Sequence, residues 1–390
     1  MPPPADPRKR AIRFIVLLGT VSLFADITYE GARSITGPFL GLLGASAAVI
    51  GVVVGAGELI GNALRLVSGY LSDRTRKYWT IVIVGYAVNL LAVPLLAFAG
   101  RWQTAALLII VERLGKAIRA PARDVLLAHA SKTVRTGWGF GLHEAMDQIG
   151  ALTGPLIVAL MLARTRDYRI GFAVLFVPAL AALFVLLVAR LRYPNPQSLE
   201  TSRAAETEGG LSKAFWLYMA AAGMIGAGFV DFPLAAFHWQ KAGVASTVWI
   251  PLLYAIAMGV DAVAALVFGR LFDRWGNRAL LGAPLFACLG VPLIFLRGFR
   301  SAIAGIALWG VAMGAQESVL RAAVAEMVPI ARRGAAYGIF NAVFGICWFA
   351  GSALMGVLYQ GSALWLVTFS ICAQLASVPL LLLTARVARR

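Results

Sequence analysis

The chain has 390 residues, of which 60% are hydrophobic, and its mean hydropathy is +0.80. This composition lies well outside that of soluble globular proteins and indicates a polytopic, all-α membrane protein. The formal net charge of +17 could suggest nucleic acid, but that partner needs a continuous basic surface, which short loops between apolar runs cannot build. No nucleic-acid partner is therefore expected.

Apolar runs of the length that crosses roughly 30 Å of hydrocarbon recur along the chain. We count about twelve such spans, about six on each side of a polar segment near residue 200. About 21 of the 35 Lys and Arg residues lie in alternate loops and at the termini, against about 7 in the opposite loops. This asymmetry predicts a cell (inner or plasma) membrane protein with both termini in the cytoplasm.

The first span, about residues 12–39, carries three ionisable residues, Asp26, Glu30 and Arg33. Their spacing places all three on one helical face. Charges within a span are costly, so they face protein or water and often mark a transport pathway. A bridge between Glu30 and Arg33 that only fixes packing is the alternative, but it leaves Asp26 without a role.

The second span, about residues 47–71, contains two pairs of glycines four residues apart, which allow another backbone to approach closely. Its ionisable residues, Glu58 and Arg65, are seven apart on one face. The turn that follows, from Gly69 to Lys77, reads G-Y-L-S-D-R-T-R-K and is dense in charge. The third span has no charge and is expected to be scaffold.

The fourth span, about residues 102–126, is the most charged. Four of its residues follow helical spacing and form one stripe that descends to the cytoplasm: Glu112, Lys116, Arg119 and Arg123. Arg113 lies beside this stripe, near the middle of the span. The charge of Arg123 is easily explained, because it lies at a solvated helix end. That explanation does not apply to Arg113.

The fifth span, about residues 137–163, combines a packing motif with polar residues. Gly150 and Gly154 permit close helix contact, while Pro155 removes a backbone donor and bends the helix. His143 and Asp147 lie below the glycines on the same face, and the adjacent face carries Glu144 and Gln148. His143 could be a packed hydrogen-bond partner or a functional group.

The second half of the chain repeats the first after a polar linker. The sequence from Gly269 to Arg278, G-R-L-F-D-R-W-G-N-R, copies the earlier turn two hundred positions later, and such a repeat indicates a duplicated unit. Asp231 in span 7 mirrors Asp26. The other ionisable residues within the second set of spans are Asp261, Glu317 and Arg321.

The doubled turn resembles the major facilitator superfamily, whose loop between helices 2 and 3 reads roughly G-x-L-x-D-R-x-G-R-K. The first copy matches at Gly69, Leu71, Asp73 and Arg74, but has Arg76 in the glycine position and Lys77 in an arginine position. The second copy matches at Gly269, Leu271, Asp273 and Arg274. It also keeps the second glycine of the motif, as Gly276. Asn277 stands in the arginine position.

This resemblance implies two six-helix bundles, at residues 1–190 and 214–390, joined by a cytoplasmic linker at residues 191–213, with a substrate site near the midplane. It implies that the turns act as gating loops, with Asp73 contacting the neighbouring half near span 11. Asp124 is the expected partner of Arg76 or Lys77.

The same resemblance associates a span-4 arginine with proton coupling, for which Arg113 is the candidate, and the Gly150–Pro155 pattern with exporting antiporters. That pattern is partial, because Val158 and Ala159 replace its final glycine pair. Together with the buried carboxylates Asp26, Glu30, Glu58 and Asp147, this predicts a monomeric, proton-coupled exporter of a small organic solute. We expect Arg113 to approach Asp26.

Two alternatives remain at this stage. The basic stripe of span 4 could serve uptake of an anionic solute, and the fold could serve a non-transporting membrane sensor or lipid-handling protein. No nucleotide-binding loop, catalytic triad or metal spacing occurs, and the three cysteines are unpaired in the sequence pattern. We therefore expect no enzyme activity, no cofactor and no metal, with the proton as the coupling ion.

Overall fold

The computed structural model describes residues 7–132, 136–194, 211–328 and 333–387. Within these ranges, the side chains of residues 128–132, 136–141 and 333–335 lie outside the description. So do the side chains of Pro7, Leu66, Asp73, Asn277, Arg321 and Ala325. The described residues form helices and the turns between them, with no strand, which confirms the predicted all-α class.

Packing divides the chain into two compact units, of residues 1–32 with 64–203, and of residues 33–63 with 204–390. The boundary near residue 203 falls within the expected linker, of which residues 195–210 lie outside the described residues. The sequence assigns residues 33–63 to the first bundle, but they pack with the second unit.

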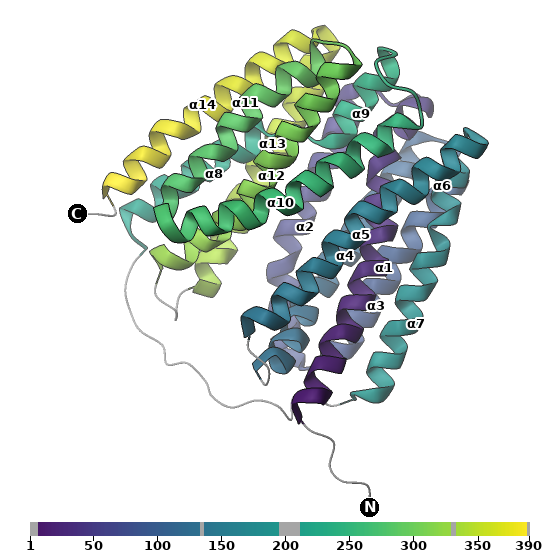
Figure 1. Cartoon of the computed structure of the whole chain (residues 1–390), viewed down its shortest axis with the longest axis vertical. Helices are drawn as coiled ribbons and strands as arrows, with labels where there is room; N and C mark the ends of the chain where they lie inside the picture. Colours follow the sequence, from purple (N-terminus) through teal and green to yellow (C-terminus); the bar gives the residue numbers. More distant parts are fainter. Residues whose placement is uncertain (1–6, 133–135, 195–210, 329–332, 388–390) are drawn as a thin grey trace, which may run out of the picture. The chain divides into compact units, whose positions relative to one another are not determined.

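Unit 1 is built from the helices of the first repeat (Figure 1). The helices that contribute to it are α1 (Pro7–Leu42), α2 (Ala47–Thr75), α3 (Tyr78–Leu95), α4 (Trp102–Lys132), α5 (Thr136–Thr165), α6 (Tyr168–Val174) and α7 (Phe176–Arg192). A 3₁₀ turn, Leu96–Phe98, follows α3. Helix α3 packs along α4 and against α7, and α4 also contacts α5.

Unit 2 contains the second repeat together with the end of α1 and the start of α2. Its own helices are α8 (Lys213–Gly228), α9 (Phe232–Lys241), α10 (Trp249–Trp275), α11 (Gly282–Phe295), α12 (Phe299–Met327), α13 (Arg333–Gly361) and α14 (Ala363–Val387). A 3₁₀ segment, Gly276–Leu281, precedes α11. Helix α11 packs along α12, as its counterpart α3 packs along α4, so the repeat is structural as well as sequential.

Among the described residues, eleven helical segments are long and apolar enough to span a membrane. The sequence predicts about twelve, and the difference is α4. This helix is 31 residues long, but the charges of its central stripe lower its hydropathy. A helix with these charges crosses a bilayer only if they face protein or water, so the residues around α4 must supply such an environment.

Span 7 is broken into α8 and α9, although the sequence predicts one continuous span. Pro233 near the start of α9 has no amide hydrogen, and its ring would collide with the carbonyl of Phe229 in a continuous helix. Side chains bond the carbonyls freed at this break: Ser370 Oγ donates to Gly228 at 2.6 Å, and Trp309 Nε1 donates to Val230 at 2.8 Å. The break ends at Asp231, directly before α9.

The turn after α2 shows why the repeated motif carries a glycine. Arg76 has φ +53°, and Gly276, at the same position of the second copy, has φ +56°. Both turns therefore need a residue with a positive φ, a backbone conformation that glycine adopts freely. The first copy has an arginine there, and the left-handed conformation costs a residue with a Cβ about 1–2 kcal/mol.

Replacing Arg76 by glycine should therefore stabilise the protein. The gain should be at most about 1 kcal/mol, because glycine also loses more chain entropy on folding. The side chain is exposed, so the lost charge should matter little. Thermal unfolding in detergent measures the change, with Lys77→Gly as the control, since Lys77 has φ −88° and no strain to relieve. Equal destabilisation by both changes would contradict this account.

Candidate functional site

Asp26 lies at the centre of a polar cluster in unit 1. Its side chain is buried and accepts a hydrogen bond from the Tyr29 hydroxyl, one turn along α1. The charged groups that act on its carboxylate include Asp147 of α5, Lys116 of α4 and Glu30 of α1. We call this set the α1 cluster; its members are Ser22, Asp26, Tyr29, Glu30, Lys116, Arg119, Arg123, His143 and Asp147.

Gly150 and Gly154 allow α5 to reach this part of α1. A side chain at Gly150 would collide with the Leu23 carbonyl and the Asp26 Cβ, and one at Gly154 with the Ile27 carbonyl. The two backbones are therefore in close contact along the face that carries Asp26. This contact places Asp147, one turn before Gly150, beside the carboxylates of α1.

Lys116 is the cation nearest the α1 carboxylates. Its Nζ lies 4.0 Å from Glu30 Oε1 and 3.9 Å from the centre of the Tyr29 ring. It thus contacts a carboxylate and an aromatic face together, and both stabilise an ammonium group out of water. One lysine is shared by two carboxylates, Asp26 and Glu30.

Arg123 connects the same cluster at the other end. Its Nη1 donates to Ser22 Oγ at 3.3 Å and lies 3.9 Å from Asp147 Oδ2. Ser22 also bonds His143 Nε2 at 3.2 Å, and His143 Nε2 lies 3.7 Å from Asp147 Oδ2. His143 therefore belongs to the charged network through both Ser22 and Asp147.

Arg119 is buried between two tyrosines. Its guanidinium carbon lies 4.2 Å from the centre of the Tyr86 ring and 5.7 Å from that of Tyr29, and the residue is 1% exposed. Among the described residues, no carboxylate pairs with it. The planar guanidinium is held by stacking on aromatic faces, which suits arginine and not lysine.

Arg113 pairs with its neighbour Glu112 (Nε to Oε2, 3.3 Å), and Asn89 Nδ2 donates to Glu112 Oε1 at 2.8 Å. Glu112 therefore bonds a residue of α3, and its charge also acts on Lys116, its neighbour in the predicted stripe. The sequence assigns the partner of Asp26 to Arg113, whereas Lys116 is the cation with the largest effect on Asp26 in this structure.

Unit 2 holds a second, smaller cluster around Asp231. Its carboxylate accepts hydrogen bonds from Trp348 Nε1 at 2.9 Å and from Ser352 Oγ, both on α13. Arg33 Nη2 lies 3.2 Å from Glu58 Oε1, and both of these charges act on Asp231. The sequence repeat predicts Asp231 as the counterpart of Asp26, and each aspartate lies at the centre of a cluster in its own unit.

The remaining predicted residues are more scattered. Asp261 is buried within α10, where Gly314 of α12 packs against its backbone. Glu144 and Glu317 are exposed, while Arg65 is half-buried in the part of α2 that belongs to unit 1. The side chain of Arg321 lies outside the described residues.

The gating loops are only partly described. Gly69 packs on Pro121, and Arg74 Nη1 lies 3.2 Å from the Tyr70 hydroxyl, whereas the side chain of Asp73 is outside the described set. Asp124, the expected partner of Arg76 or Lys77, accepts two hydrogen bonds from Arg123 instead, at 3.0 and 2.9 Å. In the second loop, Asp273 and Arg274 are exposed, and a side chain at Gly269 would meet open space.

The neutral residues that contact the charged ones were not predicted from the sequence. They are Ser22, Tyr29, Tyr86, Trp348 and Ser352. Two signals could have found some of them. Ser22 lies one turn before Asp26, and Trp348 and Ser352 are also one turn apart, so each is a polar group at helical spacing in an apolar span.

Two repeated sets of membrane-length helices, each with a buried charged cluster, define a polytopic transport fold. A family model described as Major Facilitator Superfamily matches residues 20–352, with a second match at residues 214–389. The chain belongs to this superfamily and is a membrane transporter of that type.

Relatives and a solved structure agree with this assignment. The chain is 43% identical over 379 residues to an uncharacterized protein of Mycobacterium tuberculosis, covering 95% of this chain and 93% of the relative. It is 26% identical to an uncharacterized MFS-type transporter of Methanocaldococcus jannaschii, covering 89% and 88%. The crystal structure of the peptide transporter POT in complex with sulfate has a similar fold, with a TM-score of 0.75, 15% identity and coverage of 98% and 99%.

Proposed function

We propose that the protein moves a small organic solute by alternating access, coupled to protons and in the direction of export. It acts as a monomer in the cell membrane with both termini in the cytoplasm, and it needs no cofactor. One observation carries the proposal: the α1 cluster interleaves the carboxylates of Asp26, Glu30 and Asp147 with the cations Lys116 and Arg123.

Such a cluster suits proton coupling for a physical reason. The proton affinity of a buried carboxylate depends strongly on whether a cation lies beside it. Lys116 is shared between Asp26 and Glu30, so a small movement of α4 along α1 would change which carboxylate it neutralises. Alternation between the two arrangements would load a proton in one state and release it in the other.

Uptake of an anionic solute is the second candidate, and the packing of α4 weighs against it. Its motivation is the basic stripe, but Lys116 and Arg123 contact the chain's own carboxylates. The third member of the stripe, Arg119, is buried beneath tyrosine rings. Two of the three cations of the stripe thus already face carboxylates of the chain itself. The preference for export comes from the Gly150–Pro155 motif.

Reconstitution tests the proposal. Purified protein in liposomes that enclose a pH-sensitive dye should move protons when a transported solute is added from a compound panel, and an imposed pH gradient should drive that solute uphill. Solute flux that is independent of the gradient would contradict proton coupling, and the direction of flux in inside-out vesicles separates export from uptake of an anion. Absence of flux across the panel, with specific ligand binding retained, would support the sensor or lipid-handling alternative.

Orientation has its own test. In a variant without native cysteines, Thr75→Cys should react with an impermeant maleimide only from the cytoplasmic side. Thr165→Cys, at the far end of α5, should react only from outside, and both positions are exposed. Labelling of Thr75→Cys in intact cells would reverse the proposed topology, which rests on the positive-inside distribution of Lys and Arg.

A further inference from the structure

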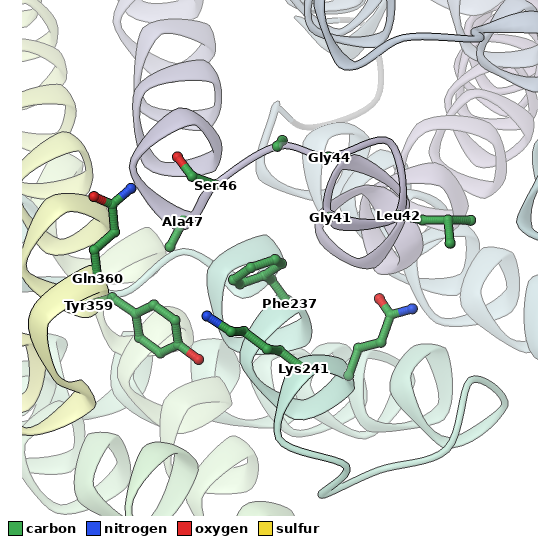
Figure 2. A pocket seen from close by; sticks show the side chains of 11 residues that line it. Gly41, Leu42, Gly44, Ser46, Ala47, Phe237, Lys241, Tyr359 and Gln360 are labelled. Atoms are coloured by element: carbon green, nitrogen blue, oxygen red, sulfur yellow. The ribbon is translucent and has the colours of Figure 1, made fainter.

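Unit 2 contains a pocket that the transport proposal does not use. It has a volume of about 510 Å³ and lies where α1 ends, α2 begins, and α9 and α13 end (Figure 2). This volume falls within the range of small-molecule sites, roughly 300–1,000 Å³. The side chains that could recognise a ligand are Ser46, Phe237, Gln240, Lys241, Tyr359 and Gln360.

Lys241 supplies the one formal charge among the lining residues, none of which is acidic. It is exposed, and no carboxylate pairs with it in the part of the chain that the structure describes. Its Nζ lies 5.9 Å from the centre of the Phe237 ring and 5.8 Å from that of Tyr359. Figure 2 shows the lysine side chain between the two aromatic side chains. The pocket therefore offers a cation beside aromatic walls.

The aromatic walls are held in place from behind. The Tyr359 hydroxyl bonds His238 Nδ1 at 2.8 Å, and the imidazole also bonds the backbone of Phe295. Phe237 packs edge-on against Tyr359, with ring centres 6.0 Å apart, and it also lies against Gly41 of α1. A ligand would meet rings that are already ordered, so binding would cost little side-chain entropy.

The helix ends around the pocket differ in how far their backbone groups are already bonded. Three helices end here, and a helix C-terminus favours cations when its carbonyls are free. Those of α1 and α9 are bonded to the following turns, through Ala45 N to Leu40 O at 2.9 Å and Val244 N to Trp239 O at 2.9 Å. Helix α2 instead begins here, and Ser46 accepts a bond from only one of its first-turn amides, that of Val49.

We propose that this pocket binds a small organic anion. The anionic group lies on Lys241, with Gln240, Gln360 and the Ser46 hydroxyl as further donors, and an aromatic or aliphatic body lies against Phe237 and Tyr359. The occupant touches four helix ends of unit 2 together and therefore stabilises their packing. The same chemistry could come from a free solute or from the headgroup of an anionic lipid.

Phenyl phosphate is a suitable probe, used with the full chain in nanodiscs of phosphatidylcholine. It should raise the midpoint of thermal unfolding in a concentration-dependent way, from which a Kd follows. Lys241→Gln should raise the Kd about tenfold or more, which is the loss of affinity expected when one charge-assisted hydrogen bond is removed. Lys241→Arg should retain binding, because it keeps the charge.

Two controls accompany this measurement. Arg297→Gln, an exposed cation outside the pocket, should bind phenyl phosphate like the wild type. Benzylamine, with the opposite charge, should not stabilise the protein. Equal effects of both compounds, or an unchanged Kd in Lys241→Gln, would overturn the proposal.

Discs that contain phosphatidylglycerol separate the two sources of the anion. If they raise the unfolding midpoint of the wild type but not of Lys241→Gln, and compete with phenyl phosphate, the occupant is a lipid headgroup. If phenyl phosphate binds equally well in both kinds of disc, the occupant is a free anion. No stabilisation by either would refute the site.

Discussion

Replacing Asp26 by asparagine should reduce transport driven by a pH gradient to the level of protein-free liposomes. Asparagine preserves the shape of the side chain and can still accept the Tyr29 hydrogen bond, but it cannot take up or release a proton. Exchange of solute at equal pH on both sides should persist, because that process needs no net proton movement. The measurement is solute flux with and without the gradient, for the wild type and the variant.

Glu144→Gln is the matched control for this experiment. It removes an acid from α5, close in sequence to Asp147, but Glu144 is exposed and its hydrogen bond from Gln148, at 3.4 Å, is weak. Its gradient-driven flux should equal that of the wild type. If Asp26→Asn also retained full gradient-driven transport, the coupling acid would lie elsewhere, and Asp147 or Glu30 would be the next residue to test.

The sequence predicts the spans and the charged faces well because both depend on local periodicity. The second span is expected at residues 47–71, and α2 covers Ala47–Thr75. Asp26 and Glu30 share a face in the prediction and a cluster in the structure, since a helix fixes their relative direction. Pro233 could have predicted the break in span 7, but the apolar run across it hides the signal.

Contacts between side chains of different helices cannot be predicted in this way, because they depend on how each helix is rotated about its own axis. Lys116 and Arg113 are three residues apart, so the sequence offers both as cations at a similar depth. Only the rotation of α4 against α1 decides that Lys116 acts on Asp26, and Arg113 pairs with Glu112. Contacts between a carboxylate and a neutral side chain, such as that between Asp231 and Trp348, leave no pattern of paired charges in the sequence from which they could be predicted.

The packing of residues 33–63 with unit 2 also could not be derived from the sequence. These residues belong by repeat to the first half, yet α2 fits closely on α13: a side chain at Gly51 would collide with the Ser352 carbonyl, and one at Gly55 would press on Phe349. Under the proposed alternating access, we expect this segment to part from such contacts during the cycle. A sequence that must allow both the packed and the separated arrangement of this segment does not indicate which of the two is observed.

Gly51→Leu should therefore separate the start of α2 from α13. Overpacking a close backbone contact costs about 1–3 kcal/mol or more, which corresponds to a shift of about 5- to 150-fold against the packed arrangement. Ala47→Cys reports the change, because Ala47 is buried and a side chain at Gly356 of α13 would collide with it. Its reaction with an impermeant maleimide should accelerate by that factor, and solute transport should fall because one of the two alternating states is disfavoured.

Gly61→Leu is the control within the same helix, since a side chain at Gly61 would meet open space. It adds the same residue to α2, with the same effect on helix propensity, and should leave both the labelling rate and transport unchanged. If Gly51→Leu and Gly61→Leu behaved alike, the glycine contact with α13 would not hold these helices together. Acceleration in Gly51→Leu alone, with the protein still folded in the membrane, would identify residues 33–63 as the part of the chain that moves away from α13.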